Sequence, residues 1–491
     1  MNVLIVFPEE LDYGKRIAVY EDFGAIGDGI HDDIEAIKAC HDYANANSLD
    51  VYATDGRTYY IGGKDVTAVI KTNTHWGAAK FIIDDRNLDN IRQSIFSVEG
   101  DADMFTPEIN SLVKNQKNVD FSHTGKVFVR VFNENKRVYI RKGLNQNNGT
   151  ASSDCFAVDE CGRVLCGINW DYPTITRAYA KSADDKPIVI EGGIFTTVAN
   201  NAESFYNYHS RNIDISRSNV TVRKVTHYVE GEGEHGAPYT GFICVNECCN
   251  FTLEDCLLSP HFTYWTASKM PGRLVPMGTY DISIGAVVGL TLRGIRQTKD
   301  ITDSKYWGLM GSNFSKEVVL EDCVMSRYDA HCGVTNAKIK NCSLGHHGVN
   351  LIGFGDFVIE NSTVYANTFI NLRSDYGSFF EGEVTVKNCT WVPRDNTRCI
   401  IGANNTGDHD FGYTCSMPYR INIDGLTIED SATDGRVYIL PRYDDRYATD
   451  KPCAYIVPET VNIKNIVIRS RRELELAEFP EMYLNTQVEC D

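Results

Sequence analysis

The chain has 491 residues, 43% of them hydrophobic, and a formal net charge of -18. This acidic balance excludes a non-specific nucleic-acid binder, because such proteins meet phosphates with lysine and arginine. No apolar run approaches the ~20 residues that cross a membrane, so no membrane partner is expected. The N-terminus lacks a basic region and reaches Pro8 early, unlike a signal peptide, which predicts a cytoplasmic protein.

Residues 21–33 (EDFGAIGDGIHDD) are rich in glycine and aspartate, and a helical pattern follows them. Apolar residues there fall on one helical face, and Asp32 is the expected N-cap, with Glu35 completing a capping box. The aspartates lack the spacing of a calcium loop, and the glycines lack the Lys-Ser/Thr of a phosphate loop. A structural role is therefore expected.

The stretch Asp22–Cys40 (DFGAIGDGIHDDIEAIKAC) closely resembles the opening motif of the pectate-lyase-like and polygalacturonase-like superfamily. The resemblance implies a right-handed parallel β-helix in which this motif forms the first strand and a helix that caps the N-terminal end. That superfamily includes lyases, hydrolases, epimerases and phage tail depolymerases, so the resemblance does not fix the reaction.

Strand-like pieces alternate with polar turns from residue 51 to about 141, and residues 151–177 are less regular, as expected for a coil with an insertion. Beyond these, one pattern recurs in which apolar and polar residues alternate before an Asp, Asn or Gly turn. Alternation with period two indicates a strand, and its return after as few as about twenty residues indicates a solenoid. Copies begin at Pro187, Val220, Phe251, Leu290, Val318, Ala337, Phe357, Val384, Ile421 and Val461.

The cysteines support this reading, because several of the sixteen recur at one phase of the pattern, where a β-sandwich would not place them. We expect these to be buried, reduced thiols: Cys256, Cys323, Cys342 and Cys389. The groups at 244–249 and 161–166 lack the paired spacing of zinc sites, so packing is favoured over metal.

The predicted fold is all-β: a single-domain right-handed parallel β-helix with an N-terminal capping helix. We expect the first strand and the capping helix in residues 1–50, β-helix coils in 51–470 and a C-terminal cap in 471–491. The acidic ELELAEF segment near the end has a partly helical pattern.

Neighbouring coils lie ~4.8 Å apart, so residues at one phase of successive coils should line up. The turn after the cysteine position gathers His261, Arg327, Asp329, His331, His346 and His347. A second row precedes the strand and holds Tyr280, Asp281, Trp307, Arg373, Asp375 and Tyr376. We expect the two rows to flank a groove, with Arg373 and Asp375 across from Asp329, and a loop with Glu234 and His235 at one end.

This mixture of side chains suits carbohydrate, since aromatic faces lie against sugar rings while charged groups bond hydroxyls. The catalytic candidates are Asp281, Asp329, His331, His347, Arg373 and Asp375. The substrate-binding candidates are Glu234, His235, His261, Tyr280, Trp307, Arg327, His346 and Tyr376. Structural alternatives stay open: Asp281 can hold a turn, Trp307 can be core, and the histidines and the acidic loop can be ordinary surface.

Hydrolysis of a glycosidic bond needs two carboxyl groups, ~5–5.5 Å or ~6.5–9.5 Å apart, and the several aspartates favour it slightly. A uronate lyase or epimerase instead needs a base beside a carboxylate and positive charge on that carboxylate. Tyr328–His331 faintly resembles a Tyr-x-Asp-Pro-His element of alginate epimerases, with Ala330 in place of proline. Gly345–Gly348 only partly resembles the Gly-His-Gly of polygalacturonases, whose other motifs are not all present.

The leading hypothesis is therefore an enzyme that cleaves glycosidic bonds of a poly- or oligosaccharide, without cofactor or metal. A lyase would leave room for calcium, and a homo-oligomer is compatible with the sequence. A non-catalytic carbohydrate-binding or phage-tail-type β-helix is the other alternative. Against a tail protein, the superfamily motif begins about twenty residues into the chain, which leaves no room before it for a particle-attachment domain.

Overall fold

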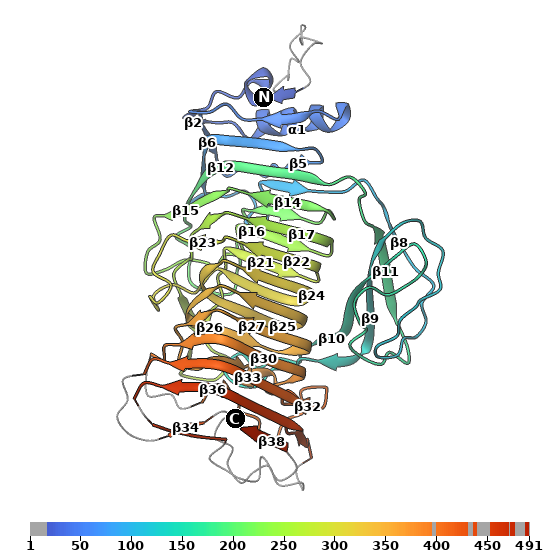
Figure 1. The fold of residues 1–491 in the computed structure, drawn as a ribbon. Helices are drawn as coiled ribbons and strands as arrows, with labels where there is room; N and C mark the ends of the chain where they lie inside the picture. The colour runs from blue at the N-terminus through green and yellow to red at the C-terminus, as the bar shows by residue number, and fades with distance from the viewer. Residues whose placement is uncertain are drawn as a thin grey trace.

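A computed structural model describes residues 17–394, 399–430, 436–438, 452–470, 472–476 and 487–490. Its strands form coils that stack along one axis from the N-terminal to the C-terminal end (Figure 1). Almost all pairs along the stack are parallel, and most join segments about twenty to forty residues apart in the chain. Ile190 and Ile213 instead pair with the more distant Thr74 and Phe96. The predicted all-β class with parallel strands is confirmed.

The longest face of the stack contains every copy of the repeat predicted from the sequence. The residue at one position of each copy pairs with the residue at the same position of the next copy. This series starts at Ile190, continues with Val222 and Leu253, and ends at Ile463, so the copies stack in register. This face comprises β6 (Thr74–Asp84), β12 (Ile188–Val198), β14 (Val220–Arg223), β17 (Cys249–Glu254), β22 (Val288–Arg293), β24 (Met310–Glu321), β25 (Val324–Lys340), β27 (Gly353–Glu360), β30 (Phe380–Trp391), β33 (Arg420–Ile428), β36 (Thr460–Ile468) and β38 (Gln487–Cys490).

Two shorter faces complete each coil. One holds β7 (Phe96–Val98), β13 (Ile213–Ile215), β16 (Ile243–Asn246), β21 (Ile282–Gly285), the first half of β24, part of β25, β26 (Ser343–Leu351), β29 (Ile370–Leu372) and β31 (Ile401–Gly402). The other holds β15 (Thr226–Glu230), β18 (Leu257–Leu258), β23 (Arg296–Gln297), the starts of β25 and β26, and β28 (Thr363–Val364).

The turn chemistry follows the sequence prediction. The residues before the recurring cysteine or serine adopt a left-handed backbone, with φ near 50°: Asp255, Asp322, Asn341, Asn361 and Asn388. Asp and Asn tolerate this conformation better than other side chains with a Cβ. The recurring cysteines, Cys256, Cys323, Cys342 and Cys389, are buried free thiols.

Charged side chains form a ladder on the outer surface of the long face. Each pairs in register with a residue of opposite sign on the next coil, and several neighbours form ion pairs, such as Arg293 with Glu254 and Glu321. Opposite charges directly across neighbouring strands stabilise a sheet. The ladder runs Glu191, Arg223, Glu254, Arg293, Glu321, Lys340, Glu360, Lys387, Asp424, Lys464.

The N-terminal end contains α1 (Ile34–Asn47), which lies over the first coils (Figure 1). Around it are β1 (Ile17–Val19), η1 (Tyr20–Phe23), β2 (Asp28–Asp32), β3 (Asp50–Tyr52), β4 (Thr58–Ile61) and β5 (Ala68–Ile70). The predicted apolar face is buried. The predicted cap is wrong: the N-cap is Asp33, whose carboxylate accepts from Ile26 and Gly27 instead, while Glu35 pairs with Lys64.

Residues 104–182 correct the prediction of coils throughout 51–470. They form a separate antiparallel sheet of β8 (Met104–Phe105), β9 (Val127–Val138), β10 (Thr150–Val158) and β11 (Arg177–Ser182). Its apolar cluster also includes Cys249, Ala286 and Val288 of the stack. Figure 1 shows this insertion beside the stack. A buried ion pair of 2.7 Å between Lys316 of the stack and Asp154 of β10 joins the two. Alternation alone does not distinguish parallel from antiparallel strands, which explains the error.

The C-terminal end also differs from the prediction. The expected cap at 471–491 lies only partly in the described residues, and there it contains strands, β37 (Glu473–Glu475) and β38, where a helical pattern was read. Short strands pair beside the last coils: β37 with β34 (Arg436–Tyr438), and β32 (Cys415–Ser416) with β35 (Tyr455–Ile456). No helix in the described part of the chain is long and apolar enough to cross a membrane.

Candidate functional site

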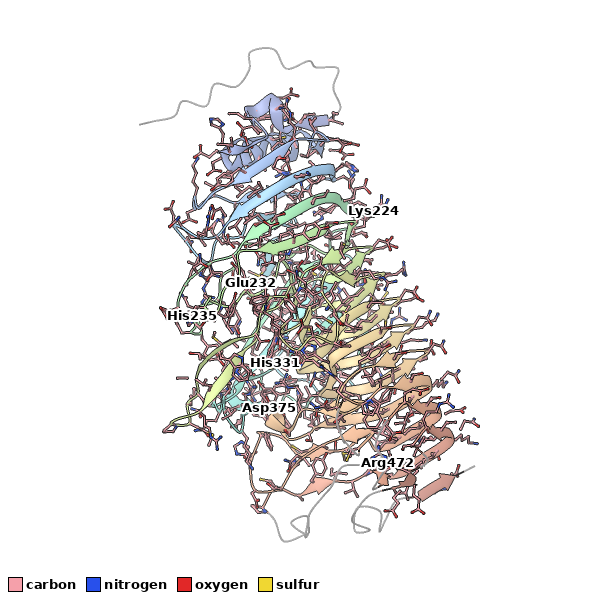
Figure 2. The ribbon with its side chains drawn as sticks, turned by 90° about the vertical axis from the view of Figure 1, so that its left-hand side faces the viewer. Lys224, Glu232, His235, His331, Asp375 and Arg472 are labelled. Atoms are coloured by element: carbon pink, nitrogen blue, oxygen red, sulfur yellow. The ribbon has the colours of Figure 1, made fainter. Side chains whose placement is uncertain are left out.

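A cleft of about 580 Å³ lies on the face formed by β21, β24, β25, β26 and β29. Four arginines, two histidines and several aromatic and asparagine side chains line it. Among the residues predicted from sequence, the lining includes Tyr280, Trp307, Arg327, His331, His347, Arg373 and Asp375. Figure 2 shows His331 and Asp375 near each other on one side of the stack.

Asp329 does not line the cleft but lies beneath it, under the lining residues Arg327, Arg373 and Tyr280. Its side chain is fully buried and accepts hydrogen bonds from Arg327 (2.6 Å), Arg373 (2.7 Å) and the Tyr280 hydroxyl (3.1 Å). Burial alone would raise the pKa of Asp329, but the two guanidinium groups outweigh it and hold the pKa far below its usual range. The carboxylate is therefore ionised at all ordinary pH values.

Asp375 is held in a similar way at the other side of Arg373. That guanidinium donates two hydrogen bonds to the carboxylate, at 3.1 and 2.7 Å, and Arg141 lies 2.7 Å from the same group. Burial opposes ionisation, but the charge and hydrogen bonds of Arg373 lower the pKa of Asp375. Asp329 and Asp375 are thus bridged by one arginine.

Register explains why these groups meet. Asp329 of β25 pairs with Asn350 of β26, which pairs with Asn371 of β29, two residues before Arg373. The predicted grouping of Asp329, His331 and His347 is found, but Arg373 and Asp375 do not lie across a groove from Asp329. They belong to the same face, two coils further along the stack.

The two cleft histidines are neutral bases. His331 bulges from β25 between the residues that pair with Ser312 and Asn313, and its ring contacts the Asn313 side chain (3.0 Å) and the Tyr376 hydroxyl (3.2 Å). Burial and the charge of Arg373 lower the pKa of His331 to about 4. Burial and Arg327 lower the pKa of His347 to about 2, and no hydrogen bond to its ring is found among the described residues.

Aromatic side chains shape the cleft around Arg327. Its guanidinium lies 4.7 Å from the centre of the Trp307 ring and 5.7 Å from that of Tyr280. Glycines make this packing possible, because a Cβ at Gly311 would lie 2.9 Å from the Tyr280 ring and one at Gly308 would lie 2.6 Å from Arg327. Burial and the Asp329 charge raise the pKa of Tyr280, so its hydroxyl keeps its proton.

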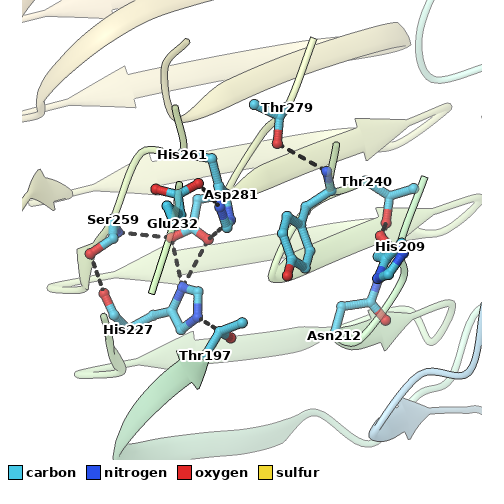
Figure 3. A network of polar contacts seen from close by, with 12 residues as sticks. Thr197, His209, Asn212, His227, Glu232, Thr240, Ser259, His261, Thr279 and Asp281 are labelled. Atoms are coloured by element: carbon cyan, nitrogen blue, oxygen red, sulfur yellow. Dashed lines mark hydrogen bonds and ion pairs between the residues drawn. The ribbon is translucent and has the colours of Figure 1, made fainter. Parts of the chain in front are cut away.

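Asp281 and His261, predicted for the site, belong to a different cluster. Asp281 is fully buried and contacts His227 at 2.9 Å, while His261 contacts Glu232 at 3.1 Å (Figure 3). The backbone amide of Ser259 also donates to Asp281, at 2.9 Å. Neither predicted residue lines the cleft: Asp281 precedes β21, His261 follows β18, and both side chains are buried among the partners named above.

Three further predicted residues do not line the cleft, and one lies just behind it. Glu234 and His235 are exposed on a loop, and Figure 2 shows His235 at the outer edge of the molecule. His346 turns away, with its ring nitrogen 3.1 Å from the Ile301 carbonyl. Tyr376 is buried behind His331 and supports that ring.

Sequence reasoning missed several lining residues that come from distant segments. They are Arg92, Arg141, Asn145, Tyr206, Tyr208, Asn313, Asn350 and Asn371. The asparagines share the phase of Asp329 or lie beside it, so phasing the strands could have found them. Arg141 and Asn145 belong to the loop between β9 and β10, whose position depends on how the insertion docks.

Comparisons with known proteins agree with this architecture. No family model matches the chain. A capsule KL64-specific depolymerase of Klebsiella phage P510 is 31% identical over 98 residues, 18% of this chain and 10% of that protein, so the match spans only a small part of the relative.

The tailspike of Pseudomonas phage phi297 superposes with a TM-score of 0.51 at 11% identity, over 92% of this chain and 80% of that chain. This chain has a pectin-lyase-like fold. The fold that the resemblance of Asp22–Cys40 implies agrees with this superposition. The tailspike of Pseudomonas phage LKA1 gives a TM-score of 0.48 at 13% identity, over 96% and 78% of the two chains.

Proposed function

We propose that this protein is a right-handed parallel β-helix, capped at its N-terminal end by α1, whose cleft binds an acidic polysaccharide and cleaves it by β-elimination. The observation that carries the proposal is a positively charged cleft that contains neutral histidines and no carboxyl group able to give up a proton. A local relative is named as a capsule-specific depolymerase, which supports a polysaccharide as the substrate.

The charge of the cleft favours an anionic sugar. The cleft is lined by four arginines and one aspartate, Asp375, with Asp329 buried beneath them. The site is therefore net positive although the whole chain carries -18. The arginines are Arg92, Arg141, Arg327 and Arg373. A concave site of one sign focuses the field and concentrates ligands of the other sign. β-Elimination requires a carboxylate on the sugar, and uronate sugars carry this group.

His347 is the proposed base. Its ring lines the cleft, lacks a hydrogen-bond partner among the described residues and is neutral. It takes the proton from the carbon next to the substrate carboxylate, a double bond forms to the neighbouring carbon, and the bond from that carbon to the glycosidic oxygen breaks. The leaving oxygen receives the Tyr280 proton. Negative charge that develops on the carboxylate is stabilised by Arg327 and Arg373.

The low pKa of His347 follows from burial and the charge of Arg327. A substrate carboxylate beside Arg327 offsets that charge, which raises the pKa and makes the ring a better base when substrate is present.

Hydrolysis with paired carboxylates, which the sequence favoured slightly, has less support. One of the two carboxyl groups must be protonated to act as the general acid. Both Asp329 and Asp375 have a lowered pKa because arginines bind them, so neither supplies that acid. An epimerase shares the first step and differs only in how the carbanion is reprotonated.

One experiment separates these reactions. The protein is incubated with polygalacturonate, alginate, hyaluronan and uronate-containing capsular polysaccharides, and with dextran as the neutral control. Absorbance of the unsaturated uronate and reducing ends are followed together. We expect both to rise in step with an acidic polymer and neither with dextran.

Reducing ends without absorbance would replace elimination by hydrolysis. Binding without either signal would favour a non-catalytic role, and binding with an inverted C5 configuration in the nuclear magnetic resonance spectrum would favour an epimerase. The variant His347→Gln should bind the same polymer with similar affinity but lose its turnover, since the amide cannot take the proton.

A further inference from the structure

The insertion sends one loop into the cleft. Residues 139–149 join β9 to β10, and the loop is fixed at its base by Tyr139, whose ring packs against Tyr376 and Tyr413 at 5.9 and 5.3 Å between ring centres. Further along, the Lys142 amide donates to the Asp375 carbonyl over 3.0 Å, and Asn145 donates to the Tyr206 hydroxyl over 2.8 Å. The loop therefore has a defined path along the cleft.

A second cavity of about 480 Å³ opens on the other side of this loop. It shares Arg141, Trp307 and Asp375 with the first cavity, so the two adjoin at the carboxylate that Arg141 binds. The loop 140–145 and the segment 404–411 supply most of its remaining lining. Together the cavities extend from the start of β16, near Thr240, to the turn after β31, six coil steps or ~29 Å along the stack.

Lys142 is the free cation of this second cavity. Its side chain is exposed, and its amine reaches only the Thr406 hydroxyl, at 3.5 Å, with no carboxylate partner among the described residues. Arg141, Arg327 and Arg373 are already bound to aspartates. An incoming anion can therefore gain a new ion pair at Lys142 without displacing an existing one.

We propose that the second cavity is a saccharide subsite supplied by the insertion, in which Lys142 binds the acidic group of a sugar next to the one that reacts. The inference rests on the proposed function, because it takes the first cavity as the reacting position. It identifies the substrate class as polysaccharides whose acidic groups recur on nearby units, and it assigns selection among them to the loop 139–149.

The test measures binding separately from turnover. The inactive full-length variant His347→Gln is titrated calorimetrically with size-fractionated oligosaccharides of polygalacturonate and of alginate. Affinity should rise with chain length until both cavities are filled. Adding Lys142→Ala should then weaken the long fragments on the order of tenfold, the value of a hydrogen bond to a charged group, and leave the short fragments unchanged.

Two variants serve as controls. Lys142→Arg keeps the charge and should keep most of the affinity. Lys117→Ala removes an exposed lysine of the same insertion that lines neither cavity and should have no effect. In the active protein, Lys142→Ala should raise the KM for polymer with little change in kcat.

The outcomes separate this inference from the proposed reaction. Length-dependent binding that needs Lys142, without any cleavage, would support the subsite and reject β-elimination. If the polymer is cleaved but Lys142→Ala and Lys117→Ala have the same affinity for the oligosaccharides, the subsite is rejected and the proposed reaction stands. Equal weakening of short and long fragments would also reject the subsite, and a complete lack of binding would overturn both.

Discussion

Arg373 Nη1 lies 2.7 Å from Oδ1 of Asp329, although the two residues are 44 positions apart in the chain. They meet because one regular coil step after another brings β25, β26 and β29 side by side. The same guanidinium binds Asp375, so one side chain sets the ionisation of both cleft carboxylates.

Loss of this arginine should therefore cost stability as well as activity. Arg373→Gln leaves Asp329 buried beside one remaining cation, and we expect unfolding by urea to show a loss of about 3 kcal/mol. Arg420→Gln, which breaks the exposed pair with Glu383, should cost less than about 1 kcal/mol. Equal costs for both variants would contradict the view that Arg373 is a buried ionic bridge.

Asp329 and Asp281 should respond differently to the same change. Asp329→Asn weakens the binding of Arg327 and Arg373 in the cleft and should reduce kcat/KM by about a hundredfold or more. Asp281→Asn perturbs the buried contact with His227 away from the cleft, so it should lower the melting temperature but keep kcat close to that of the parent protein. If the Asp281→Asn variant folds well but loses turnover, Asp281 belongs to the catalytic site and the prediction is wrong.

The pH profile of activity should lack an acid limb near pH 6.5, where an ordinary histidine titrates. In the free protein the pKa of His331 is about 4 and that of His347 about 2, so both rings stay neutral well below that value. We expect kcat/KM to stay level from pH 8 to about pH 5. A limb near pH 6.5 would show that at least one of the two rings lacks the lowered pKa described above.

Acid should destabilise the fold through buried histidines. Burial lowers the pKa of His41 to about 3 in the folded protein, against ~6.5 when unfolded. The unfolded chain then binds more protons between pH 6.5 and 3, so the stability that is present above pH 6.5 is lost as the pH falls through this window, by up to ~1.4 kcal/mol per pH unit. His41→Gln should flatten this slope in urea unfolding, and an unchanged slope would contradict this role of His41.

The charge ladder of the long face predicts a salt-dependent contribution to stability. Arg293→Glu places like charges beside Glu254 and Glu321 and should cost about 1 kcal/mol at low salt, less at high salt. Arg293→Gln, which removes the charge without placing like charges side by side, should cost less than Arg293→Glu. A cost that salt does not change would mean that packing, and not charge, is responsible.

The sequence by itself determined the repeating architecture. Its alternation, the cysteines at one phase and the Asp or Asn turns predicted which strands stack, and each copy from Pro187 to Val461 does so in register. These features are local and recur, so one reading applies to every coil. The predicted grouping of Asp329, His331 and His347 followed from counting residues after the cysteine position of each copy.

Tertiary structure decided the rest, for physical reasons that a one-dimensional pattern does not contain. A bulge in β25 turns His331 toward the cleft, whereas Asp281 is buried in the bend before β21. Arg141 and Lys142 reach the cleft because the insertion docks on the stack through Lys316 and Asp154. The lowered pKa of Asp329 requires two arginines from different coils, and only folding brings them together.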